Sequence, residues 1–132
     1  MEKLDRLLGR LDYTIVQGKT DLNITSLAYD SRKVTEGCLF VCIKGAVSDG
    51  HAYAADAAGK GAAALLVQED VTVPDSVTII KVPDTRYALA LASAAWFGHP
   101  AKRLKTIGVT GTKGKTTTTY MVKSILEQAG YR

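Results

Sequence analysis

The feature that most constrains the fold of this chain is a glycine-containing loop within residues 107–119. The segment reads Ile-Gly-Val-Thr-Gly-Thr-Lys-Gly-Lys-Thr-Thr-Thr-Thr. Residues 104–109 at its start have the composition of a short strand, and residues 115–129 place apolar side chains at helical spacing. A strand, a glycine loop and a helix in this order predict an α/β unit in which the loop opens the helix.

This arrangement is suited to binding phosphate groups. Glycines let backbone N–H groups approach an anion closely, and the helix that follows adds its positive N-terminal end. We expect Lys115 to reach the β- and γ-phosphates of a nucleotide, the Thr116 hydroxyl to bind Mg²⁺, and Thr117 to assist. Thr118 and Thr119 are expected to pack or to face solvent.

The loop is a variant of the common phosphate-binding pattern. That pattern, Gly-x4-Gly-Lys-[Ser/Thr], requires glycine at the position of Val109, whereas the glycines here are Gly108, Gly111 and Gly114. The alternative is an ordinary strand–helix turn with a solvated Lys115. That alternative does not explain why glycines, lysines and four threonines gather at one helix start.

Charge and composition narrow the class of ligand. The 132 residues carry a net charge of +4, and residues 99–132 hold seven basic side chains against one acidic. Aromatic residues are sparse beside the loop, which favours a small anion over nucleic acid. No apolar run is long enough for a membrane span and no signal peptide is visible, so we expect a cytoplasmic protein without membrane contact. Cys38 and Cys42 are expected to be buried, reduced thiols.

The remaining pattern predicts an α/β fold with a parallel or mixed sheet. Pro83 is the expected domain boundary, which gives domains of residues 1–83 and 84–132, and Asp84 is expected to cap the helix that follows. The expected helices are residues 2–11, 51–60, 85–97 and 115–129. The expected strands are residues 13–16, 24–29, 38–43, 63–67, 77–82 and 104–109.

Two segments together resemble a known family. Residues 110–118 resemble the ATP loop of the Mur ligases, the amide-forming ligases of peptidoglycan precursor synthesis. The segments Asp30-Ser-Arg-Lys-Val34, Leu39-Phe-Val41 and Asp49-Gly-His51 resemble the N-terminal, UDP-binding domain of the MurE type. The resemblance extends over residues 22–130. The related MurF type favours Thr at the position of Ser31 and Ser at that of Thr112, and folylpolyglutamate synthases share only the loop.

The resemblance implies a small N-terminal UDP-binding α/β domain followed by the first strand–P-loop–helix unit of an ATPase domain. It implies an ATP- and Mg²⁺-dependent ligase that adds a third amino acid to UDP-N-acetylmuramoyl-L-alanyl-D-glutamate through an acyl phosphate, as a monomer. Because later domains complete the family's enzymes, we expect this chain alone to be an inactive N-terminal fragment. A MurF-type ligase and a non-catalytic UDP-sugar-binding module are the alternatives.

Site residues follow from the same resemblance. Lys115 is the expected catalytic residue, and Thr116 the expected Mg²⁺ ligand. The expected ATP-binding residues are Gly111, Thr112, Lys113, Gly114, Lys115, Thr116 and Thr117. The expected substrate-binding residues are Tyr29, Ser31, Ala46, Val47 and Ser48. Lys113 stands where the family more often has Asn, and His51 is expected to begin a helix without taking part in the chemistry.

Overall fold

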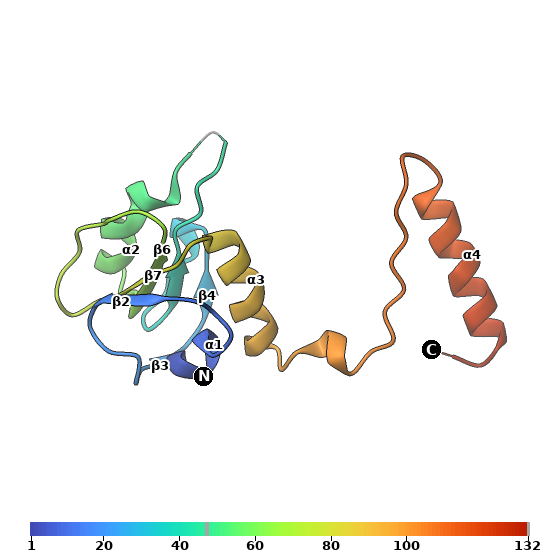
Figure 1. Ribbon diagram of the computed structural model, residues 1–132, viewed down its shortest axis with the longest axis horizontal. Coiled ribbons are helices and arrows are strands. Elements are labelled where there is room, and N and C mark those ends of the chain that lie inside the picture. Colours follow the sequence, from blue (N-terminus) through green and yellow to red (C-terminus); the bar gives the residue numbers. More distant parts are fainter. Residues whose placement is uncertain (47, 132) are drawn as a thin grey trace. The chain divides into compact units, whose positions relative to one another are not determined.

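The computed structural model describes residues 1–46 and 48–131. It divides into two compact units, Met1–Pro100 and Ala101–Arg132 (Figure 1). Within the described residues, every helix is too short or too polar to cross a bilayer.

The first unit alternates short strands and helices, as an α/β fold requires. Its strands are β1 (Glu2–Lys3), β2 (Thr14–Gln17), β3 (Asn23–Ile24), β4 (Leu27–Ala28), β5 (Leu39–Val41), β6 (Ala64–Val67) and β7 (Thr78–Lys81). Its α-helices are α1 (Leu4–Leu8), α2 (Ala54–Gly59) and α3 (Thr85–Trp96), and its 3-10 helices are η1 (Ser31–Lys33) and η2 (Gly50–Tyr53). The chain continues through the 3-10 helix η3 (Pro100–Lys102), and the second unit contains α4 (Lys115–Gln128).

Five strands form the main sheet of the first unit, in the order β2-β7-β6-β5-β4. Strands β4 to β7 are parallel, and β2 pairs antiparallel with β7 at one edge. β1 and β3 form a separate antiparallel pair. The predicted α/β class with a mixed sheet is therefore confirmed.

Helices cover both faces of this sheet (Figure 1). α1 and α3 pack on one face, where Leu39, Leu66 and Ile80 are buried. α2 packs on the other face, where Phe40, Leu65 and Ile79 are buried together with both cysteines. Because successive strand residues point to opposite faces, covering both faces explains why these strands are continuous apolar runs.

Several predicted elements differ in extent from those observed. The helix expected at residues 51–60 is α2 preceded by η2, and the strand expected at residues 38–43 is shortened to β5. The strand expected at residues 24–29 is two strands, since β3 pairs with β1 and β4 enters the main sheet. The helix expected at residues 2–11 is confined to α1, because Glu2 and Lys3 pair with Ile24 and Asn23 instead. In these last two cases pairing between β1 and β3 decides over the local sequence pattern.

The observed division of the chain comes later than the boundary expected at Pro83. α3 contacts α1 and β6, so it belongs to the compact unit that ends at Pro100. Its start is as predicted, since the Asp84 side chain accepts hydrogen bonds from the N–H groups of Arg86 and Tyr87.

The strand expected at residues 104–109 is not formed in the described part of the second unit, where this stretch has no regular structure. A strand needs a neighbour to take its backbone hydrogen bonds, and none of the described residues of this unit offers one. The predicted strand is therefore wrong for this chain, whereas the helix after the loop is confirmed as α4.

Candidate functional site

The glycine loop of the second unit has a backbone that only glycine adopts easily. Gly111 has φ 148°, and Gly114, which immediately precedes α4, has φ 77°. A side chain at Gly114 would meet no atom within 4 Å, so the requirement for glycine there comes from the backbone angle and not from crowding. The chain thus enters α4 through Gly114, whose backbone is in the left-handed conformation.

The side chain of Lys115 folds back over the loop. Its Nζ donates a hydrogen bond of 2.6 Å to the carbonyl oxygen of Gly111. The ammonium group therefore lies over the loop, and the role of Lys115 in binding phosphate stays a prediction.

The threonines at the start of α4 divide into two pairs. The hydroxyls of Thr118 and Thr119 donate to the carbonyl oxygens of Gly114 and Thr116, at 2.9 and 2.7 Å. Such bonds back to the helix are common for threonine and do not indicate a ligand. Thr116 and Thr117 are exposed on the first turn. The Thr116 hydroxyl is an oxygen donor of the kind that Mg²⁺ prefers, so this residue fits the ion expected there.

Thr112 and Lys113 complete the loop and are also exposed. All seven residues expected to bind ATP therefore lie in one loop and the first turn of α4. Their binding of ATP stays a prediction.

No residue that the structure describes between 101 and 131 is buried. The apolar face of α4 is open, with Met121 63% and Ile125 66% exposed. The glycine loop is consequently shaped by local backbone preferences and not by a packed core.

The first unit carries a separate hollow of about 470 Å³ at the carboxyl ends of β4 and β5. Tyr29, Ser31 and Ser48, three of the five residues expected to bind the UDP-sugar, line it together. Parallel sheets commonly bind ligands at this edge. Ala46 is exposed and is not among the lining residues, and Val47 lies outside the described residues.

The backbone around Ser31 is held by two ion pairs. Arg32 donates to the Asp30 carboxylate at 2.9 and 2.7 Å, as expected for a structural pair. This hydrogen bonding holds the pKa of Asp30 well below its usual range. On the other side, Lys60 donates to the carbonyl oxygen of Ser31 at 3.0 Å and to Asp56 at 2.7 Å. Ser31 is thereby fixed at the rim of the hollow.

Sequence reasoning missed other residues of the hollow, above all Tyr53. Tyr53 is 45% exposed and ends η2, where an alanine-rich helix was expected. An exposed aromatic residue among alanines was the signal that could have found it. Ile43, which is half-buried, and Phe40, which is buried, also line the hollow.

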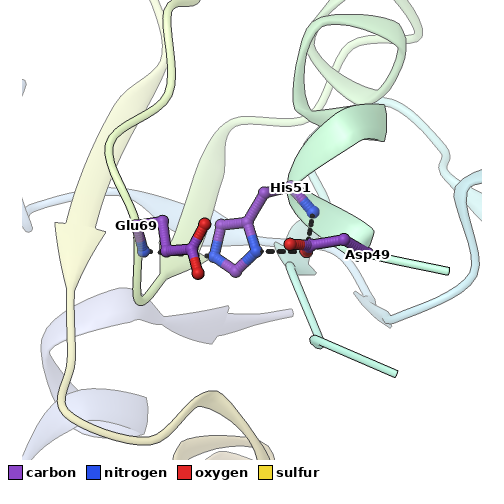
Figure 2. A group of neighbouring side chains, drawn as sticks. All are labelled: Asp49, His51 and Glu69. Carbon is purple, nitrogen blue, oxygen red and sulfur yellow. Dashed lines mark hydrogen bonds and ion pairs between the residues drawn. The ribbon is translucent and has the colours of Figure 1, made fainter. Parts of the chain in front are cut away.

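His51 lies in η2, close to the helix start expected for it, and the N–H of His51 donates to the Asp49 carboxylate at 2.9 Å. This backbone bond, with a second from the ring, lowers the pKa of Asp49. Figure 2 shows the ring between Asp49 and Glu69. Cys38 and Cys42 are buried free thiols, as predicted, and burial raises the pKa of Cys42 to about 12.

Comparison with known proteins matches the sequence of this chain to one protein family. Residues 23–123 match the Mur ligase family, catalytic domain. The UDP-N-acetylmuramoyl-L-alanyl-D-glutamate--2,6-diaminopimelate ligase of Clostridium perfringens is 51% identical over 97% of this chain and 26% of its own length. The Bacillus licheniformis protein of the same name is 48% identical over 98% of this chain and 26% of its own length. The chain thus spans about a quarter of the length of these curated relatives.

Solved structures of Mur ligases share the fold. A crystal structure of MurF from Acinetobacter baumannii aligns with 96% of this chain and 27% of its own, with a TM-score of 0.66 and 29% identity. MurF ligase from Thermotoga maritima in complex with ADP aligns with 78% of this chain and 23% of its own, with a TM-score of 0.58 and 30% identity. With its glycine loop, its mixed sheet and a family match across most of its length, this chain belongs to the Mur ligase family.

Proposed function

We propose that this chain is the N-terminal part of an ADP-forming ligase that adds the third amino acid to UDP-N-acetylmuramoyl-L-alanyl-D-glutamate in peptidoglycan precursor synthesis. One observation carries the proposal. The relative from Clostridium perfringens, which has that substrate in its name, is 51% identical over 97% of the chain. This one alignment therefore includes both the hollow and the glycine loop.

The amino acid in this proposal is 2,6-diaminopimelate. The names of the relatives from Clostridium perfringens and Bacillus licheniformis support it. In the family a later domain selects the amino acid, so no residue of this chain is assigned to that choice.

A MurF-type ligase is the second candidate, because solved MurF structures share the fold. Identity to those structures is 29–30%, against 48–51% for the two diaminopimelate ligases. Ser31 and Thr112 also follow the MurE type. These observations favour the diaminopimelate ligase.

The proposed reaction has two steps. An oxygen of the D-glutamyl γ-carboxylate attacks the γ-phosphorus of ATP, and the bond to ADP breaks. The amine of the amino acid then attacks the acyl phosphate carbon, and inorganic phosphate leaves as the amide forms. Lys115 holds the transferring phosphoryl group and offsets its charge, while the loop N–H groups orient it. Thr116 would hold a Mg²⁺ ion, which would supply positive charge to the phosphate oxygens.

The hollow of the first unit is the proposed seat of the uridine diphosphate. Tyr29 and Tyr53 offer aromatic surface for the base, and Ser31 and Ser48 offer hydroxyl and backbone hydrogen bonds. We further propose a monomeric enzyme, as the family resemblance implies. We also propose that it is cytoplasmic and contacts neither nucleic acid nor membrane, because both of its nucleotide substrates are soluble anions.

The test uses the parent ligase with Lys115→Ala and, as a matched control on the same helix, Lys123→Ala. Lys123 pairs with Glu127 one turn later and lies outside the glycine loop. We expect Lys115→Ala to abolish ligation and ATP turnover while leaving the affinity for the UDP-substrate intact, and Lys123→Ala to change neither. Normal turnover by Lys115→Ala would refute the assignment of the loop.

A further inference from the structure

The side chain of His51 is 7% exposed and borders the hollow without lining it. It projects from η2 toward Gln68 and Glu69, the first two residues after β6 (Figure 2). Neither the proposed UDP site nor the glycine loop uses the side chain of His51, although both of its ring nitrogens make hydrogen bonds.

The hydrogen bonds of the ring define its protonation. Nε2 lies 3.0 Å from the backbone nitrogen of Gln68 and 3.3 Å from that of Glu69. Backbone N–H groups only donate, so Nε2 is the unprotonated acceptor. Nδ1 then carries the proton and donates it to the Asp49 carboxylate at 2.6 Å. The assignment follows from this network and gives a neutral ring.

The same residues are spaced like a metal site, but their atoms are already used. Ligand atoms of Asp49, His51 and Glu69 lie within 4.8 Å of one another. Both nitrogens of His51 make hydrogen bonds, and the Glu69 carboxylate pairs with Lys44 at 2.5 Å. The cluster therefore works as a connection between segments and not as a metal centre.

On one side, this connection closes the loop that forms a wall of the hollow. Asp49 bridges to Lys44 across the base of the loop, and the N–H of Gly45 donates to the carbonyl oxygen of Ser48 at 2.9 Å. Ser48, directly before Asp49, Gly50, between Asp49 and His51, and Tyr53, two residues after His51, all line the hollow. Fixing Asp49 and His51 therefore fixes the short segment that carries these lining residues.

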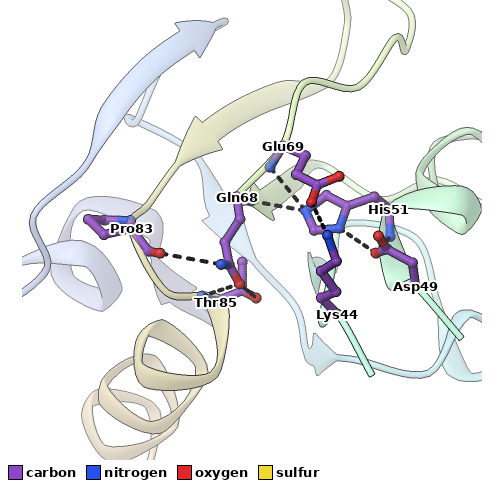
Figure 3. Close-up of polar contacts among 7 residues, drawn as sticks. All are labelled: Lys44, Asp49, His51, Gln68, Glu69, Pro83 and Thr85. Carbon is purple, nitrogen blue, oxygen red and sulfur yellow. Dashed lines mark hydrogen bonds and ion pairs between the residues drawn. The ribbon is translucent and has the colours of Figure 1, made fainter. Parts of the chain in front are cut away.

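On the other side, the connection reaches the rigid core of the unit (Figure 3). The Gln68 side chain accepts hydrogen bonds from the N–H and hydroxyl of Thr85, at 3.1 and 2.8 Å, and donates to the carbonyl oxygen of Pro83 at 3.3 Å. Thr85 is fully buried at the start of α3. His51 thus joins a surface loop to the end of β6 and the start of α3.

We propose that His51 is a positioning residue for the uridine diphosphate site, holding Ser48 and Tyr53 in place through its neutral, Nδ1-protonated ring. The proposal rests on the proposed function of the hollow. A proton at Nε2 would face the two backbone N–H groups of Gln68 and Glu69 and break both bonds, so the positioning role belongs to the neutral ring.

The test measures UDP binding to the full 132-residue chain by calorimetry and amide NMR at neutral pH. His51→Asn keeps a donor toward Asp49 but is too short to reach Gln68. His51→Gln places a carbonyl oxygen where Nε2 lies. His99→Asn is the matched control, because asparagine tolerates the left-handed backbone of His99, φ 54°.

We expect His51→Asn to weaken UDP binding about tenfold. His51→Gln should retain most of the affinity, and His99→Asn should match the wild type. Equal binding by wild type and His51→Asn, or a loss in His51→Gln as large as that in His51→Asn, would overturn the positioning role and leave the proposed function standing.

A wild-type chain in which UDP shifts no amide would overturn both proposals together. A second measurement needs no variant. Long-range nitrogen–proton NMR of the His51 ring should show the Nδ1-protonated tautomer, and a proton on Nε2 near neutral pH would overturn the positioning role even if His51→Asn fails to fold.

Discussion

In the unit Met1–Pro100, helices cover both faces of a five-stranded sheet, whereas in the unit Ala101–Arg132 no described residue is buried. The hollow of the first unit brings together Tyr29, Ser48 and Tyr53 from separate segments, so it exists only when the sheet has formed. The phosphate loop is one contiguous run, and its shape follows from glycine angles and a helix start. One site depends on long-range packing, and the other depends on local backbone preference.

The largest expected difference is in how far the same substitution lowers the free energy of unfolding in each of the two units. Leu66 is fully buried in β6, and Leu126 on α4 is 37% exposed. We expect Leu66→Ala to lower the free energy of unfolding by about 2–5 kcal/mol, since it removes packed atoms and leaves a cavity. The matched Leu126→Ala should change it by less than about 0.5 kcal/mol. Urea unfolding followed by circular dichroism measures both, and equal losses would break the comparison.

A glycine substitution tests the local origin of the phosphate loop. Gly114→Ala must place a side chain at φ 77°, which we expect to cost about 1–3 kcal/mol and to loosen the first turn of α4. Gly108→Ala is the control, because Gly108 has an ordinary φ and open space around it. Amide exchange of Thr118 and the residues after it in α4 reports the effect, because Thr118 is the residue whose N–H bonds back to Gly114 at the helix start. Faster exchange in Gly108→Ala, together with unchanged exchange in Gly114→Ala, would contradict the account.

The first unit also depends on one local signal, the cap of α3. Asp84→Ala removes the acceptor of two backbone N–H groups and should lower the free energy of unfolding by about 1 kcal/mol. Asp75→Ala, in an exposed turn, is the control and should have no measurable effect. Thermal unfolding separates the two. An equal stability of Asp84→Ala and wild type would show that packing alone defines this helix.

The smallest expected effect is on acid stability. Hydrogen bonds from His51 lower the pKa of Asp49 below its ordinary value of 3.8. The folded state therefore gains stability from this carboxylate above the ordinary value and loses it as the pH falls through the lowered one. Asp49→Asn should flatten the loss of stability at acid pH. Urea unfolding curves measured from neutral to acid pH check this, and an unchanged loss of stability in Asp49→Asn would contradict it.

The sequence is informative where structure is local and less so where pairing is distant. The capped helix at Thr85 and the glycine loop at Gly111–Gly114 could be predicted because neighbouring residues define them. The split between β3 and β4 could not, because it depends on β1 pairing with β3. The missing strand at residues 104–109 has the same cause, since a strand is specified by its neighbour as well as by its own residues.

The site shows the same division. Tyr29, Ser31 and Ser48 came from family resemblance, and the structure adds that they share one hollow. Tyr53 was missed because its role depends on η2 lying beside that hollow. The ring bonds of His51 to Gln68 and Glu69 cross seventeen or more positions of sequence, and no local pattern predicts them.

The central claim is that uridine diphosphate and ATP are bound by separate units of this chain. Amide NMR of the 132-residue chain titrated with UDP tests it most directly. The account predicts shifts at Tyr29, Ser31, Ser48 and Tyr53 with residues 111–117 unchanged, and only weak binding of Mg-ATP because the phosphate loop lacks a packed surrounding. UDP shifts confined to residues 111–117, or absent from the hollow, would contradict it.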